Sequence, residues 1–355
     1  MMKTVYKNAN NGAFDIVTED GKIVALEKTS LSGFDLDGAD VYPGLFDMHS
    51  HGCMGYDTMD QKYLHEMSVF QAEHGTTSWL PTTMTVSMDE IRAVVDAPLP
   101  DFKDAAAVLG FHMEGPYISP RYKGAQNECY IKAPDLEKFS ALSHICVVTI
   151  APELPGSMDF IRGCKSVVSL GHTAADYETA AAAMDAGAVC LTHTFNAMPP
   201  LHHRSPGPIG AAITKNAYVQ VISDGLHLHP SVVLGLYKIF GADRMLLISD
   251  SMRATGMPDG NYEFGGQEIT VKDRVARTQD GALAGSTTPL FDCVKRAISF
   301  GIPKQDAFRM ASLTPAQLCG IKNKGLLAPG YDADFIAVDD ELNLSHVIIG
   351  GNKIK

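Results

Sequence analysis

The chain has 355 residues, a formal net charge of −12, and ordinary shares of hydrophobic (45%) and charged (20%) residues. This length suits one large barrel domain or two ordinary domains, and the composition excludes a disordered or low-complexity protein. The acidic balance argues against a nucleic-acid partner, because binding a phosphate backbone needs clustered Lys and Arg. An anionic substrate would therefore need a local positive site.

Hydrophobic runs and cysteines narrow the class further. No apolar run approaches the roughly 18 to 20 residues that span a bilayer, and the polar start of the chain lacks the apolar core of a signal peptide. We therefore expect no membrane partner and a cytoplasmic location. The seven cysteines are widely spread and contain no Cys-x-x-Cys pair, so neither a disulfide framework nor a zinc ribbon is predicted, and most should be buried reduced thiols.

Both ends of the chain resemble each other in pattern. Residues 13–17 and 22–26 are strand-like fragments separated by Gly, Asn and Asp, which is typical of hairpins. Residues 334–338 and 346–349 repeat this pattern near the C-terminus. We expect a small β-sandwich domain formed from both chain termini, with residues 1–42 and 321–355 as its two parts.

Residues 43–320 have a different pattern, in which short apolar runs alternate with amphipathic stretches. This strand-then-helix order is typical of a parallel α/β sheet. Helices are predicted between several runs, and the Gly-rich segment 256–285 is predicted to form a hairpin over the barrel mouth. Eight such units predict a (β/α)₈ TIM-like barrel, with strands at residues 41–47, 78–81, 108–113, 145–150, 167–170, 189–191, 218–222 and 245–248, and helices that include residues 61–74, 176–185 and 230–240.

Side chains that bind metals follow these runs at their carboxyl ends, where barrel enzymes build their sites. His49 and His51 follow the first run, and residues two apart in an extended segment point to the same side, so both can hold one ion. Glu114, His172 and His193 follow the third, fifth and sixth runs. Taken singly, each has a plain alternative as a chance pair, a loop carboxylate or a structural histidine. Together, at four strand ends, they predict a metal centre.

Asp250 and Arg204 are candidates for other roles. Asp250 directly follows the eighth run, which places it at the barrel mouth, where a carboxylate can act as a general base. The alternative is that it caps a following helix. Arg204 lies in the Pro-rich segment 199–207, and its planar guanidinium can bind phosphate oxygens in pairs. The alternative is a surface arginine paired with a carboxylate.

The ordered set of these motifs resembles the N-acetylglucosamine-6-phosphate deacetylases of the amidohydrolase superfamily. The resemblance runs from residue 43 to residue 335 and so covers most of the chain. Each motif is weak by itself, but their order is specific. They are the His-x-His pair, Glu114-Gly115-Pro116, Gly171-His172-Thr173, the segment 193–198, Asp224-Gly225-Leu226-His227 and Ser249-Asp250.

The resemblance implies roles for individual residues. Glu114, His172 and His193 would ligate the principal metal, and His49 and His51 would hold a second ion with Glu114 as the bridge. One or two divalent ions are expected, with zinc or iron preferred and manganese or cobalt as alternatives. Asp250 would act as general base and acid for metal-bound hydroxide, and His227 would stabilise the charge that develops on oxygen. Substrate contacts are implied at Ala125, Gln126, Asn196, Ala197, Arg204, Asp224, His227, Leu283, Ala284 and Gly285.

The implied reaction removes the acetyl group from N-acetyl-D-glucosamine 6-phosphate, giving D-glucosamine 6-phosphate and acetate, in a homodimer. One alternative is a related amidohydrolase that acts on another N-acetylated sugar phosphate, such as N-acetylgalactosamine 6-phosphate, or on an N-acyl amino acid. A phosphate-binding role of Arg204 would separate these substrates. The other alternative is a non-catalytic interaction module with the same fold, against which the complete ligand set and Asp250 both argue.

Overall fold

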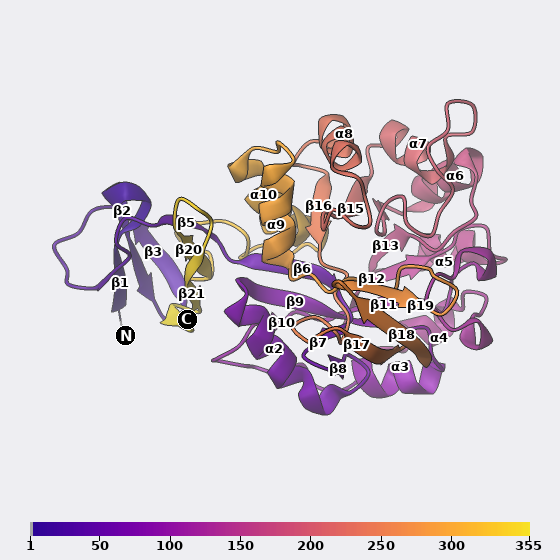
Figure 1. Ribbon diagram of the computed structural model, residues 1–355, viewed down its shortest axis with the longest axis horizontal. Coiled ribbons are helices and arrows are strands. Elements are labelled where there is room, and N and C mark those ends of the chain that lie inside the picture. The colour runs from indigo at the N-terminus through magenta and orange to yellow at the C-terminus, as the bar shows by residue number, and fades with distance from the viewer. Residues whose placement is uncertain (1–2) are drawn as a thin grey trace.

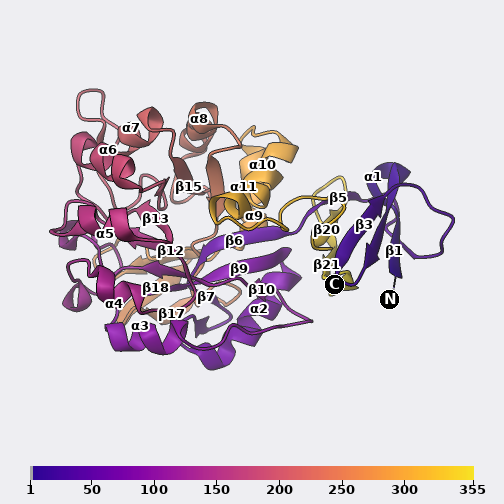
Figure 2. The same ribbon diagram turned by 180° about the vertical axis from the view of Figure 1, so that it is seen from behind.

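The small β-domain contains two four-stranded sheets that bring the two ends of the chain together. The computed structural model describes residues 3–355, and both ends lie in this domain (Figures 1 and 2). Tyr6 and Ile16 from the N-terminal part pack with Phe335 and Ile348 from the C-terminal part. This confirms a β-domain built from both termini. One sheet has the order β3 (Lys22–Leu26), β2 (Phe14–Glu19), β1 (Lys3–Asn8) and β4 (Phe34–Asp35), and the other β22 (Asn352–Lys353), β21 (Leu344–Ile349), β20 (Phe335–Val338) and β5 (Asp40–Pro43).

The chain passes from the small domain into the barrel at Gly44. Strand β5 pairs with β20, whereas the next strand, β6 (Leu45–Ser50), pairs with β9 of the barrel. The prediction of one strand over residues 41–47 was therefore wrong at its start. A Cβ on Gly44 would lie 2.2 Å from Oγ1 of Thr77, so only glycine lets the backbone pass this close to the neighbouring strand.

Eight parallel strands form the barrel, which confirms the predicted fold. Each barrel strand pairs with the next barrel strand along the chain, and the short strand β10 (Ala107–Val108) also pairs with β9. The last strand meets the first through a parallel bridge between Ser50 and Ser251 and a hydrogen bond from the Asp250 amide to the His49 carbonyl (2.9 Å). The strands are β6, β9 (Thr76–Thr83), β11 (Phe111–Glu114), β12 (Ile145–Ile150), β13 (Val167–Leu170), β14 (Cys190–Leu191), β15 (Tyr218–Ile222) and β16 (Met245–Ile248).

Helices surround the barrel on its outer side (Figure 1). The predicted helix at residues 61–74 is a short 3₁₀ turn, η1 (Gln61–Tyr63), followed by α2 (Leu64–Glu73), while the helix predicted at residues 230–240 has those bounds. Asp176 begins α6 because its side chain accepts a hydrogen bond from the Thr179 amide. The other helices are α3 (Met88–Val95), α4 (Leu136–Ser140), α5 (Ser157–Gly163), α6 (Tyr177–Ala186), α7 (Gly207–Thr214), α8 (Pro230–Phe240), α9 (Leu290–Ser299), α10 (Lys304–Met310) and α11 (Leu313–Leu318), with α1 (Ala9–Gly12) in the small domain.

A three-stranded antiparallel sheet lies beside the barrel mouth, where a hairpin was predicted. It consists of β17 (Gly260–Phe264), β18 (Gln267–Lys272) and β19 (Val275–Thr278). Phe264 and Ile269 pack with Met84 and Ala125 of the barrel loops, and Gln267 donates a hydrogen bond to the Ala125 carbonyl (2.6 Å). This sheet and the loop after β11 are therefore held together. Shorter elements nearby are β7 (Gly52–Cys53), β8 (Tyr56–Asp57), η2 (Pro120–Tyr122) and η3 (Glu128–Tyr130).

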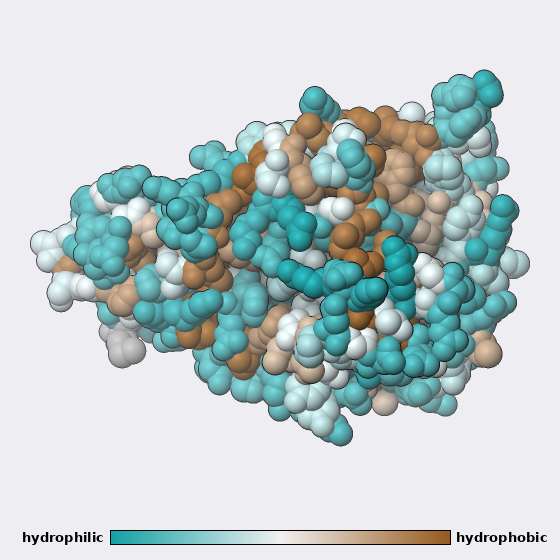
Figure 3. Space-filling view, in the orientation of Figure 1, coloured by the Kyte–Doolittle hydropathy of each residue, from teal (hydrophilic) through white to brown (hydrophobic). Residues whose placement is uncertain are grey.

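The surface and the cysteines agree with the composition. Hydrophobic residues gather over the upper part of the barrel around α7 and α8 and at the junction with the small domain, while hydrophilic residues cover much of the rest of this face (Figure 3). Leu201, Leu226 and Ile239 are exposed. Within residues 3–355 no helix is both long and apolar enough to cross a membrane. All seven cysteines are free, but fewer are buried than was predicted: Cys53, Cys190 and Cys293 are buried, Cys146, Cys164 and Cys319 are half-buried, and Cys129 is exposed.

Replacing Gly44 with Ala should destabilise the protein, because the new methyl group would overlap Thr77 at the crossing between the two domains. We expect urea unfolding to show a loss of about 1 to 3 kcal/mol, the usual cost of overpacking. Gly235→Ala is the matched control, since no atom lies within 4 Å of a Cβ at that helical position, and it should raise stability by roughly 0.5 to 1 kcal/mol. Equal stability of Gly44→Ala and the parent would contradict the close approach.

Candidate metal centre and active site

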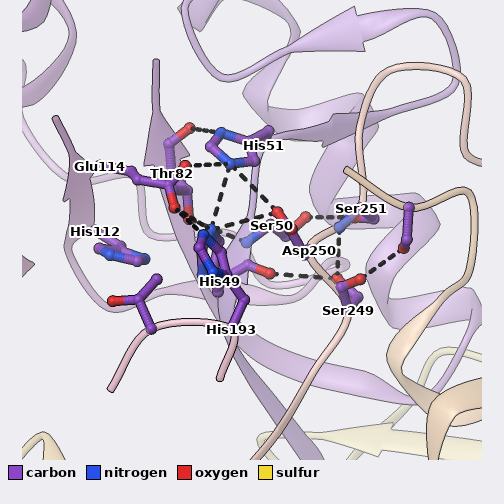
Figure 4. A network of polar contacts seen from close by, with 12 residues as sticks. His49, Ser50, His51, Thr82, His112, Glu114, His193, Ser249, Asp250 and Ser251 are labelled. Carbon is purple, nitrogen blue, oxygen red and sulfur yellow. Dashed lines mark hydrogen bonds and ion pairs between the residues drawn. The ribbon is translucent and has the colours of Figure 1, made fainter. Parts of the chain in front are cut away.

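Four histidines converge on the carboxylate of Glu114 at the ends of the barrel strands. Oε1 of Glu114 lies 3.4 Å from Nε2 of His49, 3.3 Å from Nε2 of His172 and 3.1 Å from Nε2 of His193. Its other oxygen, Oε2, lies 3.1 Å from Nε2 of His51. Figure 4 shows His49, His51 and Glu114 pointing toward one another. The residues that were predicted as ligands are thus brought to one place.

The ligand atoms form two groups that share Glu114. One group consists of His49, His51 and Glu114, and the other of Glu114, His172 and His193, with the ligand atoms in each group within 4.8 Å of one another. Nε2 atoms face each other at 3.3 Å between His49 and His51 and at 3.1 Å between His172 and His193. Two groups with a common carboxylate are what a bridged pair of ions needs.

The outer nitrogen of every one of these histidines faces an oxygen. Nδ1 lies 3.0 Å from Gln220 Oε1 in His49 and, in the other three histidines, 2.8 to 3.2 Å from a backbone carbonyl oxygen. An oxygen acceptor requires a proton on Nδ1, so each ring in its neutral form, the form that binds a metal, carries its lone pair on Nε2. All four lone pairs therefore point inward, at one carboxylate and at each other. This donor set fits a divalent cation.

The backbone is strained where several of these residues sit. His172, His193 and Asp250 have φ values of 46°, 28° and 48°, in the left-handed region that side chains with a Cβ rarely adopt. Each such residue costs on the order of 1 to 3 kcal/mol, and such strain clusters at active sites. The strand-to-loop turns here aim side chains at the cluster at the expense of local stability.

Asp250 follows β16 and faces His49 and His51 at the end of β6, across the junction where the barrel closes. Its Oδ1 lies 3.4 Å from Nε2 of both His49 and His51 (Figure 4). The alternative that Asp250 caps a helix is wrong, because strand β17 is the next element after β16. Burial would raise the pKa of Asp250, but the two imidazoles lower that pKa to about 2. Asp250 is therefore ionised, with Oδ1 directed at both imidazoles.

The pKa of Glu114 and that of His227 are set by neighbouring charges. Burial would raise the pKa of Glu114, but the imidazoles of His49 and His172 hold it well below its usual range. Burial would lower the pKa of His227, but Asp224 raises it, because its Oδ2 lies 2.7 Å from Nδ1. Asp224 also accepts hydrogen bonds from the His227 and Leu226 amides (2.9 and 2.8 Å). The ring of His227 is thus held with Nε2 free.

A pocket of about 420 Å³ opens above the cluster, within the range of small-molecule sites. Of the predicted substrate contacts, Asp224 supports His227 from behind and Ala284 is buried in the core of the three-stranded sheet. Arg204 does not line the pocket; it is exposed, and within the described residues no carboxylate forms an ion pair with it. The alternative of a paired surface arginine is therefore not supported either. The predicted residues that do line the pocket are His51, Glu114, Ala125, Gln126, His172, His193, Asn196, Ala197, His227, Asp250, Leu283 and Gly285.

Several residues at the site were not predicted from the sequence, and three of them bear on its chemistry. Arg121 lines the pocket. Among the lining residues that belong to the described chain, it is the one with a permanent positive charge. Phe264 reaches the pocket from β17, where nothing in the local pattern marks it. Gln220 lies beneath the site, and its signal was available: it is a single amide within the apolar run of residues 218–222. Gln126, which was predicted as a substrate contact, also donates a hydrogen bond to Oε2 of Glu114 (2.7 Å).

Several known proteins are similar to this chain in sequence and in fold. It is 37% identical to an N-acetylgalactosamine-6-phosphate deacetylase of Escherichia coli O157:H7, covering 94% of this chain and 92% of the relative. It is 38% identical to an N-acetylglucosamine-6-phosphate deacetylase of Lysinibacillus sphaericus, covering 95% of this chain and 92% of the relative. The crystal structure of N-acetylglucosamine-6-phosphate deacetylase from Pasteurella multocida superposes with a TM-score of 0.92 at 29% identity and covers 99% of each chain. A model of the amidohydrolase family matches residues 41–354, and the chain belongs to that family.

Proposed function

We propose that this protein hydrolyses the acetamide bond of an N-acetylated hexosamine 6-phosphate, with N-acetyl-D-glucosamine 6-phosphate as its substrate. The observation that carries the proposal is Glu114, shared by two histidine pairs under a pocket that Asp250 and His227 face. The relatives named above support the substrate class. Because they include both glucosamine and galactosamine enzymes, the galactosamine 6-phosphate derivative is the second candidate.

The donor set identifies the residues that would hold divalent ions. Glu114, His172 and His193 would hold one ion, and His49, His51 and Glu114 a second. Imidazole and carboxylate ligands suit zinc or iron first, and also manganese or cobalt. A divalent cation bound there would supply Lewis-acid chemistry, lowering the pKa of water and polarising the amide carbonyl.

Asp250, His227 and Asp224 have different roles in the proposed reaction. Asp250 accepts the proton of the water that attacks the acetyl carbonyl, and it returns a proton to the amine nitrogen as the carbon–nitrogen bond breaks. His227 donates a hydrogen bond from its Nε2–H group to the carbonyl oxygen, where negative charge develops in the transition state. Asp224 holds this ring in place through Nδ1. The products are acetate and the free amino sugar phosphate.

Arg121 and Arg204 are the candidates for binding the 6-phosphate. Arg121 follows the Glu114 motif on η2 and lines the pocket, and no carboxylate in the described part of the chain pairs with it. We therefore propose Arg121 as the phosphate ligand within one chain. Arg204 stays a proposed substrate contact, but because it does not line this pocket, its loop would have to move or belong to a second copy of the chain.

Other features support the remaining proposals. An interaction module without catalysis would not need four inward lone pairs or a carboxylate beside them. The carboxylate of an N-acyl amino acid could also bind Arg121, and the relatives, which are named as sugar-phosphate deacetylases, favour the phosphosugar over it. The homodimer and the cytoplasmic location stay predictions. Leu201 and Leu226 are exposed in the loops that precede α7 and α8, and Ile239 is exposed on α8. We propose that a second copy would bind on this side of the barrel.

Metal content should follow the two ligand groups. The parent should bind two divalent ions, and His51→Ala should bind one, because Glu114, His172 and His193 remain. Mass spectrometry of the purified proteins, dialysed against buffered zinc, counts the ions. His65→Ala is the control, since His65 is exposed and pairs only with Asp104 at the surface. Two ions in His51→Ala would disprove the assignment of the second position.

Asp250→Asn should lower kcat by roughly 10²- to 10⁴-fold, the usual contribution of general acid–base catalysis. The amide cannot accept the proton, but it has nearly the same shape, so substrate binding should change little. Steady-state kinetics with N-acetylglucosamine 6-phosphate, together with metal analysis of the same sample, measure this. Asp101→Asn makes the same substitution at an exposed position and should leave kcat unchanged. A fully active Asp250→Asn would exclude Asp250 as the base.

Arg121→Ala should lower kcat/KM for the phosphorylated sugar. The decrease should correspond to a loss of about 1.5 to 3 kcal/mol in transition-state binding, the range of a charge-assisted hydrogen bond. Arg204→Ala should lose a similar amount if its loop reaches the phosphate. Neither change should affect unphosphorylated N-acetylglucosamine. Arg162→Ala, at an exposed arginine that pairs with Asp159, is the control. Parent activity of both Arg121→Ala and Arg204→Ala toward the phosphorylated sugar would make an unphosphorylated amide the better substrate.

A further inference from the structure

Gln220 differs from the other groups that face Nδ1 of the four histidines, because it is a side chain and they are backbone carbonyls. Its Oε1 lies 3.0 Å from Nδ1 of His49, whereas Nδ1 of His51, His172 and His193 each faces a backbone carbonyl oxygen. A backbone carbonyl can only accept a hydrogen bond, so it fixes the proton of those three rings on Nδ1. The proton of His49 is instead set by a side chain, whose chemistry can be changed by substitution.

The buried amide of Gln220 has two ends with opposite chemistry. The side chain is fully buried inside the barrel on β15, and its Nε2 has no hydrogen-bond partner within residues 3–355. With Oε1 toward Nδ1, His49 keeps its lone pair on Nε2, where it can bind a cation. If the amide turned, its N–H group would face Nδ1, and the proton of His49 would move to Nε2, toward Glu114. The amide orientation therefore decides whether His49 can act as a ligand.

We propose that Gln220 is the positioning residue that controls occupancy of the second metal position, formed by His49, His51 and Glu114. The inference rests on the metal centre of the proposed function and adds a residue that touches neither metal nor substrate. Outer partners of this kind orient a ligand and raise its basicity, and their loss typically weakens metal binding by about 10- to 100-fold. The position formed by Glu114, His172 and His193 does not depend on Gln220.

A second buried contact at the same depth provides a matched control. The ring of His112 lies 4.4 Å from that of His49, and its Nε2 lies 2.8 Å from Oγ1 of Thr149. Oγ1 of Thr149 lies 2.8 Å from Oγ1 of Thr192. Thr149→Val removes these hydrogen bonds with little change in volume, but it leaves Nδ1 of His49 and its partner in place. A general disturbance of the barrel interior would affect this variant as well.

The experiment compares the parent with Gln220→Leu, Gln220→Glu and Thr149→Val. Each protein is stripped with a chelator and titrated with Zn²⁺ by calorimetry, bound zinc is counted by mass spectrometry, and circular dichroism checks the fold. In Gln220→Leu one ion should bind as in the parent and the other roughly 10- to 100-fold more weakly. Gln220→Glu should keep both ions, because a carboxylate has two accepting ends and holds the proton on Nδ1. Thr149→Val should keep both.

The possible outcomes separate the two proposals. If the parent binds two ions and Gln220→Leu binds both equally well, loses both, or behaves like Thr149→Val, the role of Gln220 is excluded while the metal centre stands. If the parent binds no divalent ion, the proposed function fails as well. Should Gln220→Leu not fold, Gln220→Glu decides: affinity for the second ion at or above that of the parent supports the role, and weaker affinity overturns it.

Discussion

The arrangement of the site depends on one buried carboxylate surrounded by imidazole lone pairs. Glu114 is almost completely buried, and four Nε2 atoms approach its two oxygens. Because Nδ1 of each ring faces an acceptor, neutral rings would present lone pairs at Nε2 that repel one another and the carboxylate. Burial would lower the pKa of His49 and His51, but Glu114 and Asp250 raise both, so the cluster favours positive charge at its centre. A divalent cation bound there would supply that charge and would stabilise the folded state.

The barrel provides the rigidity that such a cluster needs. Parallel strands end at one face, so ligands far apart in the sequence meet without long flexible connections. The seam between β6 and β16 contributes most directly, because the amides of Asp250 and His51 donate to the carbonyls of His49 and Ser251 (2.9 and 2.7 Å). The same hydrogen bonds that close the barrel thus set Asp250 beside the histidine pair. The loop after β11 and the three-stranded sheet contribute Arg121 and Phe264 to the walls of the pocket.

The sequence allowed the barrel, the β-domain and the residues that gather around Glu114 to be predicted, since each of them lies within two residues of the carboxyl end of an apolar strand. It did not show where the chain changes sheets, because residues on both sides of Gly44 are strand-forming and the close contact with Thr77 is tertiary. Arg121 was missed for a similar reason: a loop residue has no periodicity that shows its direction. Arg204 stood out in a Pro-rich segment, but local stiffness does not determine which pocket a side chain reaches.

The union of both chain ends in one small domain has a consequence for how the protein folds. The hydroxyl of Tyr6 donates to the carbonyl of Gly351, a hydrogen bond between residues 345 positions apart, and β5 pairs with β20 across the whole barrel sequence. Contacts of such separation form late, because the loop must close before they contribute any stability. Strands β1 to β4 can pair with one another early, but β5 and the apolar face of this sheet have no partners until β20 and β21 are made. The open edge and the uncovered face make this stage the one most prone to aggregation.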